Sequence, residues 1–338
     1  MLSKLLKICF LKKRRGGGFT LIELLVVVAI IGILSGIVIV AVGDHTERAR
    51  MARSQVFSRT IHSQIGMDMV GNWPLNHAVG TPPVTHDLSG WGNDGTLVDG
   101  NHANADGNTP PTFVPGVIGQ GLRFDGVDDF VDAGNAPSLR NMGSAVTVEA
   151  WVRYDTYTGG GGRPYSVIAV KGYPWTFLLE NPSQRIRFRV TAGGVDASAS
   201  DLAIHTLNRW YHFVGTYNGQ NIRIYKDGIR VGITLRTGEL AINEGTVRIG
   251  TWGNTSYNFN GIIDEVRIYR AAMPTSYIQK RYVQGIKGLV ANGGITQEEK
   301  QERLAVLRNS DHLAIDLDAA LFGNIDFSQY DKYLAFEK

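Results

Sequence analysis

The chain begins with an almost unbroken apolar run and then changes to an amphipathic pattern. Over residues 19–42 the one ionisable side chain is Glu23. At about 1.5 Å per residue this run predicts a helix of roughly 36 Å, enough to cross about 30 Å of hydrocarbon. Apolar residues then recur three to five positions apart until a Gly71-Asn72 break. We therefore predict one helix over 19–72, with its first part spanning a membrane.

From Trp73 to about Met273 the pattern becomes short alternating runs between turn residues. Asp227-Gly228 suits a type I′ hairpin turn between two of these runs. With no long helix between them, the runs predict an antiparallel two-sheet sandwich. The ten strand candidates are 119–124, 128–134, 145–153, 165–172, 175–180, 185–191, 210–217, 221–228, 247–251 and 262–269.

After Met273 the pattern indicates a helical tail over 274–338. Pro274 suits a first helical position, and Thr296 with Glu299 forms a capping box that begins a second helix. The stretch after 311 has no clear period. The fold class expected is therefore mainly β, with a long N-terminal helix and short C-terminal helices.

Residues 1–18 read as a leader peptide. Six lysines and arginines precede Gly16-Gly17-Gly18 with no acid among them, which keeps this end in the cytoplasm. The small residues come before the apolar run, so a cut there leaves the helix on the mature chain. Cutting after Gly18 frees an amine on Phe19, one helical turn from Glu23. A carboxylate in a bilayer costs about 2.5–3.5 kcal/mol, and the amine of a neighbouring subunit would neutralise it.

The run Gly18-Phe19-Thr20-Leu21-Ile22-Glu23-Leu24-Leu25 resembles the cleavage and methylation motif of type IV prepilins and type II secretion pseudopilins. The resemblance implies cleavage after Gly18 by a prepilin peptidase, methylation of Phe19, and assembly with other pilin subunits through the helix. It also implies a single-pass protein of the cytoplasmic membrane with an extracytoplasmic head, extracellular once assembled. Many pilins carry a proline where this chain has Val40.

Removing the leader changes the charge of the chain. The formal net charge is +3, and the leader holds six positive charges, so the mature chain would be net negative. A general nucleic-acid-binding role is therefore disfavoured. The one cysteine, Cys9, is in the leader, so the mature chain has no thiol chemistry.

Several ordered stretches of the second region resemble the laminin-G-like jelly roll of the concanavalin A superfamily. The resemblance implies a sandwich over 73–273 that serves as a recognition or adhesion module, frequently with a structural calcium. The stretches are "HDLSGWGNDGTL" (86–97), "GLRFDGVDDFVDAG" (121–134), "VTVEAWVR" (146–153), "NRWYHFVGTYNGQNIRIYKDGIRVG" (208–232) and "GIIDEVRIYRAAM" (261–273).

Calcium prefers six to eight oxygen ligands, and two places could supply them. The glycine-rich stretch 86–95 offers Asp87 and Asn93, and the resemblance brings Asp264 of the last strand near the first. The three residues are our candidate calcium ligands. In the alternative, Asp87 and Asn93 only cap turns through neighbouring backbone amides.

Aromatic residues in two loops suggest a carbohydrate site, because a pyranose offers one apolar face. The candidates are Tyr157, Trp252 and Tyr257; in the alternative, the aromatic residues of this region are core residues. Strand alternation places the arginines of "RIRFR" (185–189) on one face. These arginines are either paired with acids on neighbouring strands or form a surface for an acidic polysaccharide or DNA.

We do not expect an enzyme. Related glucan hydrolases need two carboxylates in one cleft, whereas Glu149 stands alone in its strand. Asp264 and Glu265 are adjacent, so strand alternation predicts that they point to opposite faces. His212 is expected to be packed within a strand, and the motifs of hydrolases and phosphate-binding loops are absent from the printed sequence.

The sequence therefore predicts a pilin-like filament subunit whose lectin-like head attaches to a carbohydrate or a host or partner-cell surface. The alternatives are a purely structural major pilin or a secretion pseudopilin without a ligand. A minor pilin for DNA uptake is less favoured. A large head would crowd a dense filament, which favours a minor or tip position.

Overall fold

The structure, a computed structural model, describes residues 21, 24–28, 30, 68–100, 109–157, 164–181, 183–253, 257–311, 313 and 314. The chain forms two units, 1–63 and 64–338, which are considered separately. In the first unit, residues 24–28 are helical. None of the helices among the described residues is long and apolar enough to cross a membrane. The predicted cleavage and assembly residues Gly18, Phe19 and Glu23, and most of the predicted span, lie outside the described residues.

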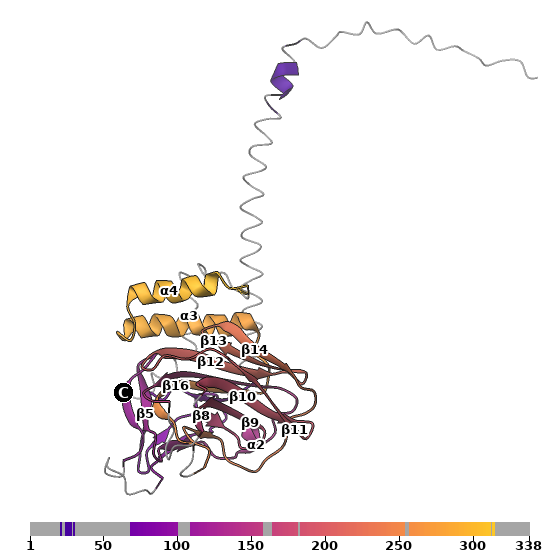
Figure 1. Cartoon of the computed structure of the whole chain (residues 1–338). Helices are drawn as coiled ribbons and strands as arrows, with labels where there is room; N and C mark the ends of the chain where they lie inside the picture. Colours follow the sequence, from indigo (N-terminus) through magenta and orange to yellow (C-terminus); the bar gives the residue numbers. More distant parts are fainter. Residues whose placement is uncertain are drawn as a thin grey trace, which may run out of the picture. The chain divides into compact units, whose positions relative to one another are not determined.

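The second unit is built on two packed antiparallel sheets of eight strands each among the described residues, as expected (Figure 1). The first sheet has the order β14-β13-β12-β7-β16-β5-β4, and β1 also pairs with β16. Its strands are β14 (Ile229–Leu235), β13 (Asn221–Lys226), β12 (Trp210–Tyr217), β7 (Val146–Tyr154), β16 (Asn260–Tyr269), β5 (Gln120–Asp125), β4 (Thr112–Pro115) and β1 (Met69–Trp73).

The second sheet has the order β11-β10-β9-β8-β15-β6-β3-β2. Its strands are β11 (Val195–Ser200), β10 (Arg185–Ala192), β9 (Trp175–Glu180), β8 (Tyr165–Val170), β15 (Arg248–Ile249), β6 (Phe130–Asp132), β3 (Gly95–Val98) and β2 (Val84–Thr85). The short helix α2 (Pro137–Arg140) follows β6.

Strand alternation builds the core between the sheets. In β10, Ile186, Phe188 and Val190 are fully buried, and the residues between them face outward. The predicted hairpin turn is confirmed, because Asp227 and Gly228 have φ of 52° and 79° between β13 and β14. A type I′ turn needs positive φ at both of its central positions, and Asp-Gly is one of the few residue pairs that adopt this conformation readily.

The start of the sandwich corrects the predicted helix over 19–72. Met69–Trp73 is strand β1, buried along its whole length and paired antiparallel with β16. In the sequence, the helical spacing of apolar residues extends as far as Met69, which is why the helix was predicted to continue. In the structure, Trp73 at the end of β1 is buried in the main core. Tertiary pairing with β16 therefore decides the structure here, and the sandwich begins four residues earlier than predicted.

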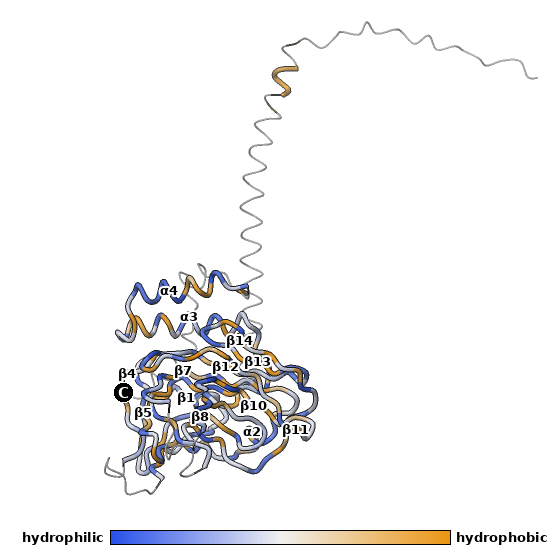
Figure 2. Tube along the Cα trace, viewed as in Figure 1, coloured by the Kyte–Doolittle hydropathy of each residue, from blue (hydrophilic) through white to orange (hydrophobic). Residues whose placement is uncertain are grey.

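Two helices cover the outer face of the first sheet, α3 (Thr275–Ala291) and α4 (Gln297–Arg308) (Figure 1). Both were predicted, and the Thr296 side chain accepts a hydrogen bond from the Glu299 amide as a cap should. A second core forms under them from Trp151, Trp210 and residues of both helices such as Tyr282. Figure 2 shows hydrophilic residues along much of α4, the outer helix of the pair. The second sheet is left without a helical layer among the described residues.

Candidate functional site

The outer face of the second sheet carries a small apolar cluster separate from the main core. Val167 and Val170 of β8 and Leu178 of β9 point outward here and are buried. The half-buried side chains of Tyr165, Trp252 and Tyr257 pack on them. We call these three rings the aromatic cluster. Two of its members, Trp252 and Tyr257, are residues that the sequence proposed for ligand contact.

The rings of the aromatic cluster lean against one another. The centroids of Trp252 and Tyr257 are 6.0 Å apart at an interplanar angle of 40°, and those of Tyr165 and Tyr257 are 5.9 Å apart at 45°. The Arg189 guanidinium carbon lies 5.5 Å from the Trp252 ring centroid, within the range of a cation–π contact. The face thus offers half-exposed aromatic surface beside a fixed polar group.

Tyr157, the third proposed contact, is held by a different part of the molecule. Its ring packs against the main core, and its hydroxyl donates to the backbone carbonyl of His205. Its hydroxyl and much of its ring are therefore occupied by the domain itself. The structure assigns Tyr157 a packing role and brings Tyr165 to Trp252 and Tyr257 in its place.

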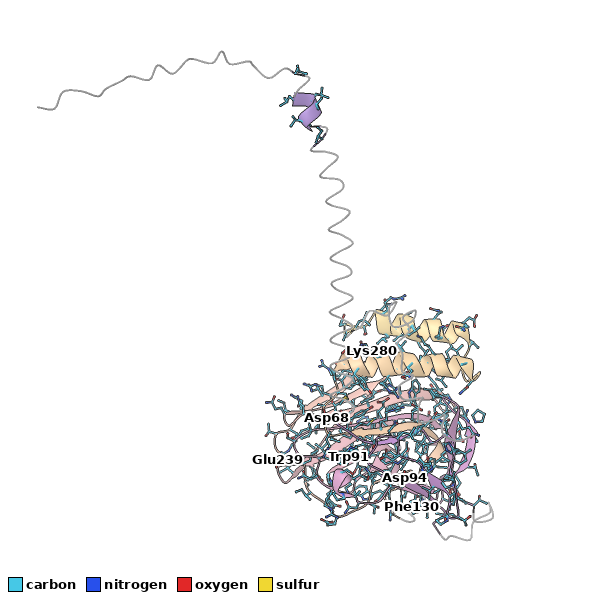
Figure 3. All side chains as sticks on the ribbon, turned by 180° about the vertical axis from the view of Figure 1, so that it is seen from behind. Asp68, Trp91, Asp94, Phe130, Glu239 and Lys280 are labelled. Carbon is cyan, nitrogen blue, oxygen red and sulfur yellow. The ribbon has the colours of Figure 1, made fainter. Side chains whose placement is uncertain are left out.

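Two of the three arginines of β10, Arg187 and Arg189, lie on this outer face and are paired with acids, as in one of the two predicted alternatives. Arg187 lies 2.9 Å from Glu180 of β9, and Arg189 binds Asp196 of β11. The pKa of Asp196 is lowered by hydrogen bonds from Thr191 and then Arg189. On β15, Arg248 lies 3.4 Å from Asp132 and 4.9 Å from the Phe130 ring centroid. Figure 3 labels Phe130 at the end of the sandwich away from Lys280 of α3.

The first proposed calcium ligand, Asp87, has no acceptor site left for a metal. One carboxylate oxygen accepts from the amides of Asn72 at 2.9 Å and Ser89 at 2.8 Å. The other accepts from the Ser89 hydroxyl at 2.6 Å and the Asn93 amide at 2.9 Å. A carboxylate has about four lone-pair sites, and four donors fill them. The contacts are those of the turn-capping alternative, and they brace this loop (Trp91 and Asp94 in Figure 3) against β1.

The other two proposed ligands are also occupied by protein donors. The Asn93 side-chain oxygen accepts from the Ser138 hydroxyl at 3.2 Å, and its amide nitrogen donates to the Val70 carbonyl at 2.6 Å. Asp264 accepts from the amides of Val117 at 2.7 Å and Glu265 at 2.7 Å, in a different segment from Asp87. Burial, and then the neighbouring Glu265, raise the pKa of Asp264 well above its usual value. These three residues do not fit a calcium site, and within the described part of the chain no group of three or more His, Cys, Asp or Glu could hold a metal.

A buried charge network fixes α3 on the first sheet. The Glu149 carboxylate of β7 lies 3.2 Å from Arg281 of α3, 3.5 Å from Arg267 of β16 and 3.1 Å from His212 of β12. Glu265 binds the same two arginines, at 3.1 Å from Arg281. All five side chains are buried. A buried charge is tolerated only when paired in this way, so the network ties helix to sheet.

The network also sets the charge of Glu149. Burial alone would raise the pKa of Glu149, but Arg281, a hydrogen bond from His212 and the charge of Arg267 hold it well below its ordinary value. His212 is thus packed within its strand, as predicted. Sequence reasoning missed the network, although one signal was present: a glutamate inside the apolar strand "VTVEAWVR" needs a buried cation.

A β-bulge corrects the predicted directions of Asp264 and Glu265. The register of β16 against β7 shifts between Asp264 and Arg267, and Glu265 has φ of 53°. The extra residue breaks the alternation. Asp264 then lies opposite Trp151, which packs under α3, and Glu265 reaches Arg281 of α3. Both carboxylates therefore lie on the helix-covered side of the sheet.

Residues 125–279 match the concanavalin A-like lectin/glucanases superfamily, and residues 13–39 match the prokaryotic N-terminal methylation motif. The chain joins a pilin-type methylation motif to a concanavalin A-like domain. Near the motif it is 35% identical over 75 residues to the type IV major pilin protein PilE1 of Neisseria gonorrhoeae, covering 22% of this chain and 35% of that protein. It is 33% identical over 75 residues to a fimbrial protein of Neisseria meningitidis, covering 22% of this chain and 44% of that protein.

The concanavalin A-like domain is also similar to a solved structure, the binding domain of Paraclostridial Mosquitocidal Protein 1. The TM-score is 0.51 at 14% identity, covering 66% of this chain and 53% of that one. At such a low identity, the structural similarity shows a shared fold and nothing more. The chain spans less than half of the length of these two pilin relatives.

Proposed function

We propose that the protein is a filament subunit of the type IV pilin kind that displays its concanavalin A-like domain as a carbohydrate-recognition head. One observation carries the proposal. A methylation motif shared with pilins precedes a sandwich whose second sheet presents the aromatic cluster on a face that no described helix covers. The motif supplies assembly, and the aromatic cluster supplies a surface suited to a sugar ring.

The assembly part of the proposal rests on residues 13–39. A prepilin peptidase would cut after Gly18, and the new amine on Phe19 would be methylated. Before assembly, the subunit would be anchored in the cytoplasmic membrane with its head on the extracytoplasmic side. It would then join other subunits through the apolar helix. The pilin relatives match over this region, which supports the proposal.

The chemistry of the face favours a neutral glycan over an acidic one. Arg187, Arg189 and Arg248 each have a carboxylate partner, in Glu180, Asp196 and Asp132. Each of these three pairs leaves little net charge to attract a polyanion. The third arginine of β10, Arg185, is exposed at the start of the strand and stands outside these pairs. Hydroxyl-rich sugars on a host or partner-cell surface therefore suit the face better than acidic polysaccharide or DNA.

The experiment is to replace Trp252 and Tyr257 together by alanine in the full chain. Binding to glycan arrays, on whichever glycan wild type recognises, should fall at least tenfold. The melting temperature should change little, because both rings are only half buried. The matched control is Tyr173→Ala, since that ring is 61% exposed outside the cluster. Full binding by the double variant would disprove the site.

The competing function is a purely structural subunit, either a major pilin or a secretion pseudopilin. Mass spectrometry and labelled electron microscopy of purified filaments separate the two. Copies along the whole fibre would favour the structural role, and rare copies at the end would favour an adhesin.

The proposal does not include catalysis. Glu149 and Glu265 are buried and are bound by two arginines, one of them on α3. A hydrolase needs a carboxyl pair facing an accessible cleft.

A further inference from the structure

A lysine buried near one end of the second sheet has no role in the sites above. Lys171 directly follows β8, and its side chain is fully buried. Its Nζ contacts two oxygens, the side-chain Oδ1 of Asn135 and the backbone carbonyl of Gly245. Neither partner carries a formal charge, so burial of this amine as a cation is poorly compensated.

Asn135, the side-chain partner, is held from its other end. Its Nδ2 donates to the Glu244 carbonyl at 2.9 Å and lies 3.2 Å from the Glu244 carboxylate oxygen Oε2. Three segments therefore meet at one carboxamide: the turn after β6, the end of β8 and the loop 243–246. An amine is on the oxygen side of this carboxamide, and a carboxyl group is on its nitrogen side.

We propose that Lys171 and Asn135 form an intramolecular isopeptide bond, with Glu244 carrying the proton. The proposal is independent of the carbohydrate-binding function. The Asn135 Oδ1 that Nζ contacts is bonded directly to Cγ, the atom that the amine attacks. The amine and the carboxamide carbon are therefore held next to each other before reaction.

The reaction balances without an added reagent. The neutral Nζ attacks Cγ of Asn135, and a new C–N bond forms as the carbonyl electron pair moves to Oδ1. Glu244 takes a proton from the attacking nitrogen and delivers it to Nδ2. The carbonyl re-forms, the Cγ–Nδ2 bond breaks, and one ammonia leaves. Nothing is oxidised or reduced, and the product is an amide joining two side chains.

The protonation state of Lys171 suits a nucleophile. Burial, and then the charge of Arg140, lower the pKa of Lys171 to about 8, against the opposing charges of Glu244 and Asp132. About a tenth of the molecules therefore hold a neutral amine at pH 7, and most hold one at pH 9. Glu244 itself reaches solvent, with its side chain 73% exposed, so it can exchange protons.

The product would close the chain across 36 positions, from Asn135 to Lys171. Such a covalent link restricts the unfolded chain as a disulfide does. It also needs no oxidant, and the printed sequence has no cysteine after Cys9 with which to build a disulfide.

The test is peptide mass spectrometry of the full chain, purified in detergent and held overnight at pH 9 before denaturation and trypsin digestion. In wild type we expect peptide 124–140, carrying Asn135, joined to 154–185, carrying an uncut Lys171. The pair should weigh one ammonia less than its two parts. Nearly all of the linear 124–140 peptide should disappear. Wild-type protein that yields linear 124–140 in full overturns the proposal.

Variants separate the bond from a purely structural role of the buried lysine. Lys171→Met and Asn135→Ala should abolish the joined peptide, and Glu244→Gln should slow its appearance at least tenfold. Asn135→Asp should still form it, now with loss of water. The neighbouring Asn141→Ala is the matched control and should cross-link as wild type. Circular dichroism confirms that each variant is folded, and an unchanged rate in Glu244→Gln overturns the role of that residue.

Discussion

Two buried carboxylates show how one chemical group serves different ends in this protein. Asp87 accepts four hydrogen bonds from neutral donors and organises a loop against β1. Glu149 meets two arginines and a histidine and holds a helix to a sheet. The partners decide the role, because a buried acceptor is stabilised by whichever donors the fold brings to it.

Replacing Asp87 by alanine should destabilise the domain by about 3 kcal/mol, because three backbone amides lose their acceptor. The loss should be the same in calcium and in EDTA, since protein donors occupy the carboxylate. Thermal unfolding in the two buffers measures it, with the exposed Glu302→Ala as control. A melting temperature that rises with calcium in wild type, but not in Asp87→Ala, would contradict this assignment.

Glu149 should make stability depend on pH. Its pKa in the folded protein lies below the ordinary value of 4.5, so the folded state binds the proton more weakly than the unfolded state. The contribution is present above pH 4.5 and is lost as pH falls below it. In Glu149→Gln, the decline in urea-unfolding free energy below pH 4.5 should be shallower than in wild type. Equal slopes would show that other groups dominate.

At the scale of elements, α3 depends on close approach to the first sheet. A Cβ built on Gly285 would lie 2.3 Å from the Trp151 ring, so only glycine allows the helix to sit where it does. Trp151 in turn stacks on Tyr282, with centroids 5.8 Å apart at 12°. Helix α3 is therefore held on the sheet both by packing against Trp151 and by the ion pairs of the charge network.

Gly285→Ala should therefore destabilise the protein, by about 1–2 kcal/mol, although alanine favours helix by about 1 kcal/mol. The overpacked ring outweighs the gain in propensity. The control is Lys280→Ala on the same helix. It should leave the free energy of unfolding nearly unchanged, because the change adds no atoms against Trp151. Chemical denaturation of both variants measures the difference, and a more stable Gly285→Ala would refute the packing argument.

Most elements follow from local pattern, and the exceptions have identifiable causes. The central strands and both C-terminal helices were predictable because alternation, turn residues and caps agree. Strand β11, "VDASAS", was missed because small polar residues give it little pattern, and its pairing with β10 decides it. At the candidate site, Trp252 and Tyr257 were predicted, whereas Tyr165 was left out because strand order decides which rings meet.

At the scale of the whole molecule, the proposed function divides the chain into a part that assembles and a part that recognises. The methylation motif covers 13–39, and the concanavalin A-like match covers 125–279. The two matches share no residues, so substitutions in one region should leave the other intact.

Glu23→Ala tests the assembling part. The variant should insert in the membrane and lose its leader normally, because a more apolar helix is easier to insert. It should assemble poorly, because the carboxylate that meets the Phe19 amine of the next subunit is gone. Filament yield relative to total mature protein measures this, and an unchanged yield would contradict the pairing.

The position of β1 has a mechanical consequence. In a tethered subunit, tension between the filament and a bound surface enters the head through residue 68 and acts first on Met69–Trp73. That strand is buried along its length and ends at Trp73, which lies in the main core. It pairs with β16, and β16 in turn lies between β7 and β5 in the first sheet. Detaching it requires several hydrogen bonds to break and an indole to leave the core. The point where force arrives is therefore held both by pairing with β16 and by packing in the core.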